Sequence, residues 1–381
     1  MKTLLTAMTI ITAAVSPITN VAAATGVQDL KEFDSQVNEI FQQVYSDPSQ
    51  PGAGVIILKD WKPVVKHFYG MANLDTGEPI TDKTNFCIAS VSKQFAAIAL
   101  LQLAEKGIIS LNDPLSKFFP EFQAPFFKDI TLHNILSHTS GIPDARVRSS
   151  REFVLFSTDV ESVGYMKTLD YLNFIPGSQY EYVNPTYQLI YQIVERATGT
   201  PFETYMHKNI FGKAGMKHTQ YFEPDRNITH LAHGYGWDEK LNRYTEYDYG
   251  EETFFATKAD GALYTSLSDF IKWEKALAHL KVWNAASRMM AYTPKITIPA
   301  DAEYGYQPYT GYGYGFFIQH EPGRCPIVYH TGDNGGFTIY AGKIPAHNVV
   351  FLFFSTRNDI DRMKMVNAVY DKMEPLGWLK P

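Results

Sequence analysis

Residues 90–107 read SVSKQFAAIALLQLAEKG, and this stretch decides the fold. From Phe95 to Ala104 nearly every side chain is apolar, so the helix that these residues predict is apolar on all sides. Such a helix is stable only when other elements cover it completely. Gly107 follows it as a C-terminal cap. We therefore expect a buried helix over residues 91–106, around which the rest of the chain packs.

Strand patterns occur near both ends of the chain, and helical patterns dominate the middle. The strand-like runs are 54–58, 64–69, 326–330, 337–344 and 349–355. Helical spacing is found at 28–45, 187–197, 267–280 and about 361–373. The order predicts an α/β protein of the α+β kind: an antiparallel sheet flanked by helices, built from both chain ends, with an inserted, mainly helical lobe.

The length of 381 residues suits two lobes, because single cores stop growing near roughly 250–300 residues. We expect an α/β lobe formed by about 28–80 and 255–381, and a helical lobe of about 81–254. Together they make up one domain, 25–381.

The first 24 residues have the pattern of a signal peptide. Lys2 supplies the positive charge, residues 4–11 a short apolar core, and residues 22–24 a small-residue cleavage site before Thr25. No later run is long enough and apolar enough to cross a bilayer. These features predict an exported protein, periplasmic or extracellular, without stable membrane insertion.

Composition excludes several other classes. Hydrophobic residues make up 45% and charged residues 19%, with a net charge of −6 and no cluster of Lys and Arg, so a nucleic-acid partner is not expected. Two cysteines, Cys87 and Cys325, are too few for a disulfide framework or a zinc site. We interpret both as buried thiols, although a bridge between them remains open. The sequence does not determine the oligomeric state.

The first chemical motif is Ser90-x-x-Lys93, at the start of the apolar helix. Helix periodicity returns Lys93 to the face of Ser90, and the first-turn amides there have no helical partners. A buried lysine amine can act as a base on such a hydroxyl. The alternative is that Ser90 only caps the helix and Lys93 is a surface residue.

A second motif would relay the proton and complete the pocket. Tyr182-Val183-Asn184 offers a phenol and an amide, between Pro176-Gly177 and Pro185. Tyr171-Leu172-Asn173 has the same spacing and is a competitor. We favour the later pair, while a packing tyrosine and a turn asparagine remain the alternative.

The third motif is His330-Thr331-Gly332, at the end of a predicted strand and before Asp333. A glycine there lets substrate backbone lie along the strand edge, and a following amide can face an oxyanion. His330 could bind an anionic group, but only in part at neutral pH. His133 and His138 are five residues apart, which is poor spacing for a metal site on a helix, and we interpret them as structural. Motifs for a nucleophile elbow, a zinc protease or a nucleotide loop are absent.

Taken in order, the three motifs resemble those of the serine β-lactamase and penicillin-binding superfamily, in its class C β-lactamase and D-alanyl-D-alanine carboxypeptidase branch. The resemblance extends through residues 86–95, 106–115, 136–143 and 261–266, and covers about 34–372. It implies an acyl-enzyme hydrolase without a metal or organic cofactor.

The resemblance also implies a role for each site residue. Ser90 is the nucleophile, and Lys93 and Tyr182 share its proton, the formal base being left open. Asn184 binds the substrate amide, and His330, Thr331 and Gly332 hold the far end of the substrate. The backbone amides of Ser90 and Asp333 form the oxyanion hole.

One departure bears on the substrate. Most class C β-lactamases have lysine where this chain has His330, and a permanent charge suits the carboxylate of a β-lactam. We therefore expect a peptidase on D-amino-acid or cell-wall peptides, similar to D-alanyl-D-alanine carboxypeptidases. The alternatives are a carboxylesterase, a class C-like β-lactamase, a D-aminopeptidase or amidase, and, outside enzymes, a penicillin-binding sensor. A small molecule or peptide is the expected partner.

Overall fold

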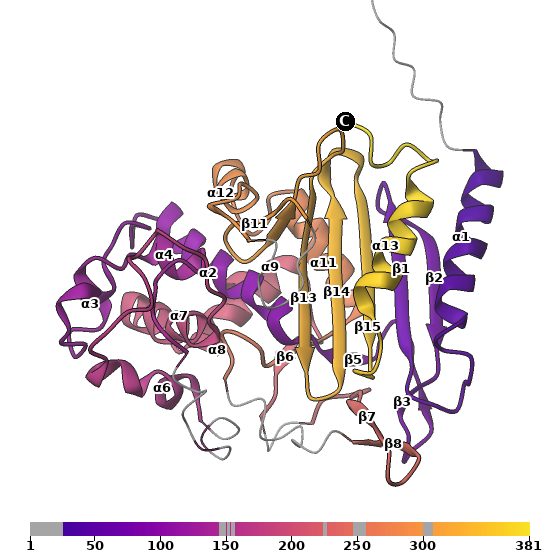
Figure 1. Cartoon of the computed structure of the whole chain (residues 1–381), viewed down its shortest axis with the longest axis horizontal. Coiled ribbons are helices and arrows are strands. Elements are labelled where there is room, and N and C mark those ends of the chain that lie inside the picture. The colour runs from indigo at the N-terminus through magenta and orange to yellow at the C-terminus, as the bar shows by residue number, and fades with distance from the viewer. Residues whose placement is uncertain are drawn as a thin grey trace, which may run out of the picture.

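An eight-stranded antiparallel sheet joins the two ends of the chain (Figure 1). The computed structural model describes residues 26–144, 150, 153, 157–223, 227–246, 257–299 and 308–381, so the predicted signal peptide lies outside the described residues. In spatial order the strands are β10 (Ile296–Thr297), β11 (Thr310–Tyr312), β12 (Phe317–Gln319), β13 (Ile327–Asn334), β14 (Phe337–Ile344), β15 (Val349–Ser355), β1 (Ala53–Lys59) and β2 (Lys62–Tyr69). The expected sheet from both termini is confirmed, because β1 pairs with β15 in the register Ala53 to Ser355.

Both faces of this sheet are buried around β15, which explains why this strand is apolar without a break from Val349 to Phe354. In β15, Val350, Leu352 and Phe354 enter one core, and Val349, Phe351 and Phe353 enter the other. Alternation along a strand directs successive side chains to opposite faces. Helices α1 (Val27–Gln42) and α13 (Arg362–Met373) cover one face, and α11 (Leu267–Ala278) packs on the other (Figure 1).

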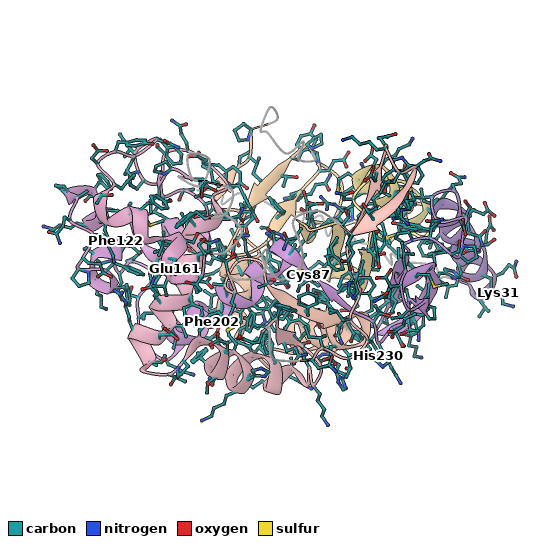
Figure 2. All side chains as sticks on the ribbon, turned by 90° about the horizontal axis from the view of Figure 1, so that it is seen from below. Lys31, Cys87, Phe122, Glu161, Phe202 and His230 are labelled. Carbon is teal, nitrogen blue, oxygen red and sulfur yellow. The ribbon has the colours of Figure 1, made fainter. Side chains whose placement is uncertain are left out.

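The middle of the chain is mainly helical, as expected. Its helices are α3 (Leu115–Phe118), α4 (Leu132–Leu136), α6 (Asp159–Ser162), α7 (Asn184–Thr198), α8 (Phe202–Met206) and α9 (Gly212–Ala214), with the short turns η2 (Pro125–Lys128), η4 (Gly164–Thr168) and η5 (His207–Phe211). The apolar stretch of residues 93–105 forms α2 (Lys93–Glu105), which is buried on nearly all sides. In the view of Figure 2, Cys87, just before α2, lies near the centre of the molecule, between the helical part around Phe122 and the α1 end at Lys31.

Short strands missed by the sequence analysis complete the molecule. The strands β5 (Asn85–Cys87), β9 (Leu263–Ser266) and β6 (Gln220–Tyr221) form a three-stranded sheet. Two further pairs are β3 (Met71–Asn73) with β4 (Glu78–Pro79), and β7 (Tyr235–Asp238) with β8 (Arg243–Glu246). The remaining elements are α12 (Ala285–Ala291) and η6 (Pro345–His347). Strands of two to four residues carry too little periodicity to be predicted.

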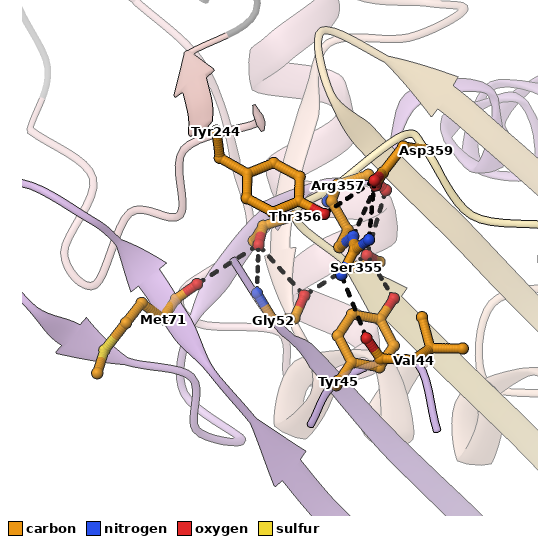
Figure 3. A network of polar contacts seen from close by, with 9 residues as sticks. All are labelled: Val44, Tyr45, Gly52, Met71, Tyr244, Ser355, Thr356, Arg357 and Asp359. Carbon is orange, nitrogen blue, oxygen red and sulfur yellow. Dashed lines mark hydrogen bonds and ion pairs between the residues drawn. The ribbon is translucent and has the colours of Figure 1, made fainter. Parts of the chain in front are cut away.

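A polar network joins the chain ends at one edge of the layers (Figure 3). The Tyr45 hydroxyl, after α1, donates to Ser355 Oγ at 2.8 Å, and the Gly52 amide donates to Thr356 Oγ1 at 3.0 Å. Arg357 bonds both carboxylate oxygens of Asp359 and the carbonyl of Val44. These hydrogen bonds hold together two segments that are about 310 residues apart in sequence.

In the described part of the chain, no helix has both the length and the apolar composition that a membrane span requires.

A buried ion pair links α11 to the sheet, and its contribution to stability can be measured. Lys343 Nζ on β14 lies 2.8 and 2.9 Å from the carboxylate oxygens of Glu274 on α11, and both side chains are buried. Removing one partner leaves a buried charge, so Lys343→Met should lower the free energy of unfolding by roughly 3–5 kcal/mol. The double variant Lys343→Met/Glu274→Leu should lose less than that single variant. Urea unfolding of both variants measures this, and a double variant that loses more than Lys343→Met would contradict it.

Candidate active site

Ser90 lies on a tight turn that connects β5 to α2. Residues Ala89–Ser92 form a 3-10 turn, η1, and the α-helix begins at Lys93, two residues later than expected, so Ser90 lies within the 3-10 turn that precedes the helix. Ala89 has a φ of +46°, a conformation that costs energy for a residue with a Cβ. The Ile88 amide donates to Leu263 O on β9 at 2.9 Å, which holds the start of this turn. The half-buried Ser90 side chain is thus presented from a rigid, strained segment.

The Lys93 amine is fully buried and lies against Ser90. Its Nζ is 3.0 Å from Ser90 Oγ, 2.7 Å from Asn184 Oδ1 and 3.0 Å from the carbonyl oxygen of Asp260. The oxygens of Asn184 and Asp260 can only accept hydrogen bonds, whereas the Ser90 hydroxyl can also donate. The Ser90 contact is therefore the one of the three along which a proton can pass from a hydroxyl to the amine.

Tyr182 and Asn184 adjoin the same amine. Asn184 begins α7, and the centre of the half-buried Tyr182 ring lies 5.0 Å from Lys93 Nζ. The competing pair makes other contacts: Tyr171 is 40% exposed, and the Asn173 amide donates to the Glu181 carboxylate. The geometry therefore brings the second of the two Tyr-x-Asn motifs to Lys93.

The Asp260 carbonyl is a site group that the sequence analysis missed. The segment before it is held by Asp159 on α6, whose carboxylate accepts from the amides of Lys258 at 2.6 Å and Ala259 at 3.0 Å. Burial, reinforced by the nearby Asp260, raises the pKa of Asp159 well above its usual value. A backbone carbonyl carries no residue-type signal, so no motif could have indicated this contact.

Strand β13 packs directly against the Ser90 turn. A Cβ on Gly332 would lie 2.4 Å from Ile88 O and 3.1 Å from the Ala89 Cβ, so only glycine permits this approach. Strand β12 pairs with Ile327–Tyr329 and no further, while β14 continues along β13 to Asn334. The part of β13 from His330 onward therefore has strand pairing on one side only, among the described residues. Thr331 is half-buried, and the exposed Asp333 forms an ion pair with Arg362 at 2.7 Å.

His330 is fully buried and is not directed as the sequence suggested. Its Nδ1 lies 2.7 Å from Thr331 O, which can only accept, so Nδ1 carries the proton and Nε2 accepts from the Tyr312 hydroxyl at 3.1 Å. Burial, and then the charge of Lys93, lower the pKa of His330 to about 3. The expected contact with an anionic group would need a protonated, accessible ring, so it does not follow from this geometry.

Both cysteines are buried thiols rather than halves of a bridge. Cys87 Sγ lies 3.5 Å from Gly261 O, and Cys325 Sγ lies 3.0 Å from Lys380 O. Among the residues that the structure describes, no group of three or more His, Cys, Asp or Glu side chains could hold a metal ion.

The close approach of Gly332 on β13 to the Ser90 turn can be tested by adding one methyl group at residue 332. Gly332→Ala should push β13 away from the Ser90 turn and lower kcat/KM by about 100-fold, because a displacement near 1 Å can cost that much. Hydrolysis of a chromogenic ester and thermal unfolding would be measured together. Gly164→Ala is the control, because a Cβ there meets nothing within 4 Å. Full activity of Gly332→Ala would contradict the proposed packing.

The neutral state of His330 predicts acid sensitivity. Its folded pKa of about 3 lies below the ordinary 6.5, so the unfolded chain gains a proton first as the pH falls, and stability is lost from about pH 6.5 downward. Between pH 7.5 and 4.5 the loss from this residue is roughly 3 kcal/mol. Urea unfolding of the wild type and of His330→Asn at both pH values should show a smaller difference in the variant. The exposed His279, changed to Asn, should leave the difference unaltered.

Comparison with known proteins identifies the family of the chain. The model of the family described as Beta-lactamase matches residues 37–371. The chain is 26% identical to penicillin-binding protein 4* of Bacillus subtilis over 313 residues, which are 77% of this chain and 65% of that protein. It therefore spans somewhat less than two thirds of that relative. It is also 26% identical to a beta-lactamase of Pseudomonas fluorescens, over 90% of this chain and 98% of that one.

Solved structures share the fold. The octameric penicillin-binding protein homologue from Pyrococcus abyssi superposes with a TM-score of 0.74 at 26% identity, covering 92% of this chain and 78% of that one. The D-amino acid amidase from Ochrobactrum anthropi, at 20% identity, has a TM-score of 0.73 over 90% and 99% of the two chains, and shows the fold alone. Since the family model spans nearly the whole described chain, the protein belongs to the beta-lactamase family and is a serine hydrolase of the beta-lactamase and penicillin-binding superfamily.

Proposed function

We propose that this protein forms an acyl-enzyme at Ser90 and acts on D-amino-acid or cell-wall peptides, in the manner of a D-alanyl-D-alanine carboxypeptidase. The observation that carries the proposal is the 3.0 Å contact between Ser90 Oγ and the fully buried Lys93 Nζ. A hydroxyl becomes an effective nucleophile when an adjacent base takes its proton as it attacks.

In the proposed reaction Ser90 Oγ attacks the substrate carbonyl, and its proton passes to the Lys93 and Tyr182 pair. The backbone amides of Ser90 and Asp333 would stabilise the oxyanion. Collapse of the tetrahedral intermediate breaks the bond to the leaving group, which takes the proton from the same pair. A water molecule, deprotonated in turn, then releases the acyl group and restores the Ser90 hydroxyl.

The free side of β13 supports an extended peptide as the substrate. Strand addition at an open sheet edge supplies backbone hydrogen bonds, and neighbouring pockets supply side-chain specificity. The edge from His330 to Asp333 adjoins the Ser90 turn, so a peptide paired there would bring a carbonyl to Ser90. Asn184 would hold the amide of that peptide.

A carboxylesterase is the second candidate, and the neutral His330 favours it. With its ring buried between Tyr312 Oη and Thr331 O, His330 offers no positive charge to a substrate carboxylate. Neutral esters and amides would lose nothing by this, whereas β-lactams and free C-terminal D-alanine would.

The same proposal includes export. The pattern of Lys2, the apolar residues 4–11 and the alanines at 22–24 supports cleavage before Thr25. Mass measurement of the secreted protein would test it, and a retained N-terminus in the secreted fraction would contradict it.

Covalent labelling tests the nucleophile. Ser90→Ala should abolish labelling by a fluorescent penicillin or fluorophosphonate, because no other hydroxyl is assigned to attack. Ser92→Ala is a matched control, since Ser92 is buried two residues away and its hydroxyl has no hydrogen-bond partner in the described structure. Labelling that survives in Ser90→Ala would overturn the assignment.

A substrate panel then separates the candidates. Diacetyl-Lys-D-Ala-D-Ala, nitrocefin, p-nitrophenyl butyrate and D-alanine p-nitroanilide report peptidase, β-lactamase, esterase and aminopeptidase activity in turn. Turnover of the first supports the proposal, whereas turnover of the ester alone supports the second candidate. A stoichiometric burst without further product would instead indicate a penicillin-binding sensor.

A further inference from the structure

His138 is a buried histidine whose ring lies against the Tyr182 ring. It is 1% exposed and has a φ of +55°, in the left-handed region that non-glycine residues seldom adopt. The His138 and Tyr182 ring centres are 4.3 Å apart with 33° between the planes, and Tyr187 on α7 lies 4.8 Å away at 32°. The backbone strain is thus combined with an extensive aromatic contact at the candidate active site.

His138 also holds the backbone on both sides of Tyr182. The Glu181 amide donates to the His138 carbonyl at 3.0 Å, and the Val183 amide donates to His138 Nδ1 at 3.3 Å. One residue therefore contacts the two neighbours of Tyr182 and the Tyr182 ring itself. Packing alone would require only the ring contact.

The Val183 contact determines the tautomer of the imidazole. Because Nδ1 accepts a hydrogen bond from the Val183 amide, the ring hydrogen is on Nε2, which is buried and has no partner in the described structure. Burial, and in second place Lys93, lower the pKa of His138 well below its ordinary value. Protonation would destroy the acceptor at Nδ1, so the ring can serve Val183 only while it is neutral.

We propose that His138 is a positioning residue, which holds the Tyr182 phenol in its reactive place beside Lys93 through the Nδ1 contact to Val183 and the ring contact to Tyr182. This inference rests on the proposed function, because it assigns His138 a role only through the proton relay of Tyr182. It gives the second histidine of the pair at 133 and 138, interpreted from sequence as merely structural, a task in the reaction.

Two variants divide the contacts of His138. His138→Phe keeps an aromatic ring against Tyr182 but removes the acceptor for the Val183 amide. His138→Asn keeps an acceptor near Nδ1 and tolerates the left-handed backbone, but removes the ring. The carbonyl bond to Glu181 does not depend on the side chain and remains in both. The control is His230→Asn, since His230 also has a positive φ, of +53°, but is exposed and paired with Glu78.

The decisive measurement is a double-mutant cycle with Tyr182→Phe on a chromogenic ester. In the wild-type background each His138 variant should lower kcat by about 10- to 100-fold, with KM changed by about twofold or less. In the Tyr182→Phe background the same variants should cost less than about threefold, because the phenol that they displace is already absent. Thermal unfolding accompanies each assay, and His230→Asn should match the wild type throughout.

Three outcomes would overturn the inference. An equal loss in both backgrounds would mean that His138 acts independently of the Tyr182 phenol. A loss confined to KM would make it a substrate-binding residue, and full activity of both variants would give it no role. If one variant does not fold, the other completes the cycle.

Failure of the proposed function is distinguishable from these outcomes. A wild type that turns over no substrate in the panel would refute the hydrolase proposal itself. The rate of fluorophosphonate labelling at Ser90 then replaces kcat in the same cycle, and an equal slowing by His138 variants in both backgrounds would overturn the positioning role.

Discussion

The buried amine of Lys93 is the constraint on which the rest of the structure depends. It forms hydrogen bonds with Ser90, Asn184 and the Asp260 carbonyl, which are 3, 91 and 167 positions away in sequence. An amine taken out of water without partners costs several kcal/mol, so the Ser90 turn, the start of α7 and the segment before β9 must all be in place together. The same requirement that stabilises this packing also sets the nucleophile beside its base.

The two buried histidines show how a buried amine affects the groups around it. His138 and His330 both have a lowered pKa, mainly from burial and in second place from Lys93. A neutral imidazole beside a buried amine avoids a second uncompensated charge, at the expense of acid stability. Each ring instead contributes a fixed tautomer: Nδ1 of His330 donates to Thr331 O, and Nδ1 of His138 accepts from Val183.

The family comparison agrees with the observed architecture. It does not identify the substrate, which depends on the residues of the site. Relatives at 26% identity include proteins named as a penicillin-binding protein and as a beta-lactamase, so one scaffold serves different reactions. In this chain the residue that bears most on the choice of substrate is His330. It is neutral and lies on β13, the strand that packs against the Ser90 turn. Burial, and in second place Lys93, lower the pKa of His330 to about 3, so at neutral pH its ring carries no charge.

The sequence by itself determined the core helix, the sheet built from both chain ends and the three motifs, because apolar periodicity and motif spacing are local properties. The apolar residues of 93–105 predicted a buried helix, and the run at 349–355 predicted a strand, and the structure has both. Tertiary structure alone decided which Tyr-x-Asn meets Lys93, that the Asp260 carbonyl joins it, and that His330 turns inward. These three features depend on contacts between residues far apart in sequence. The position of a backbone carbonyl and the orientation of a ring have no sequence pattern from which they could be predicted.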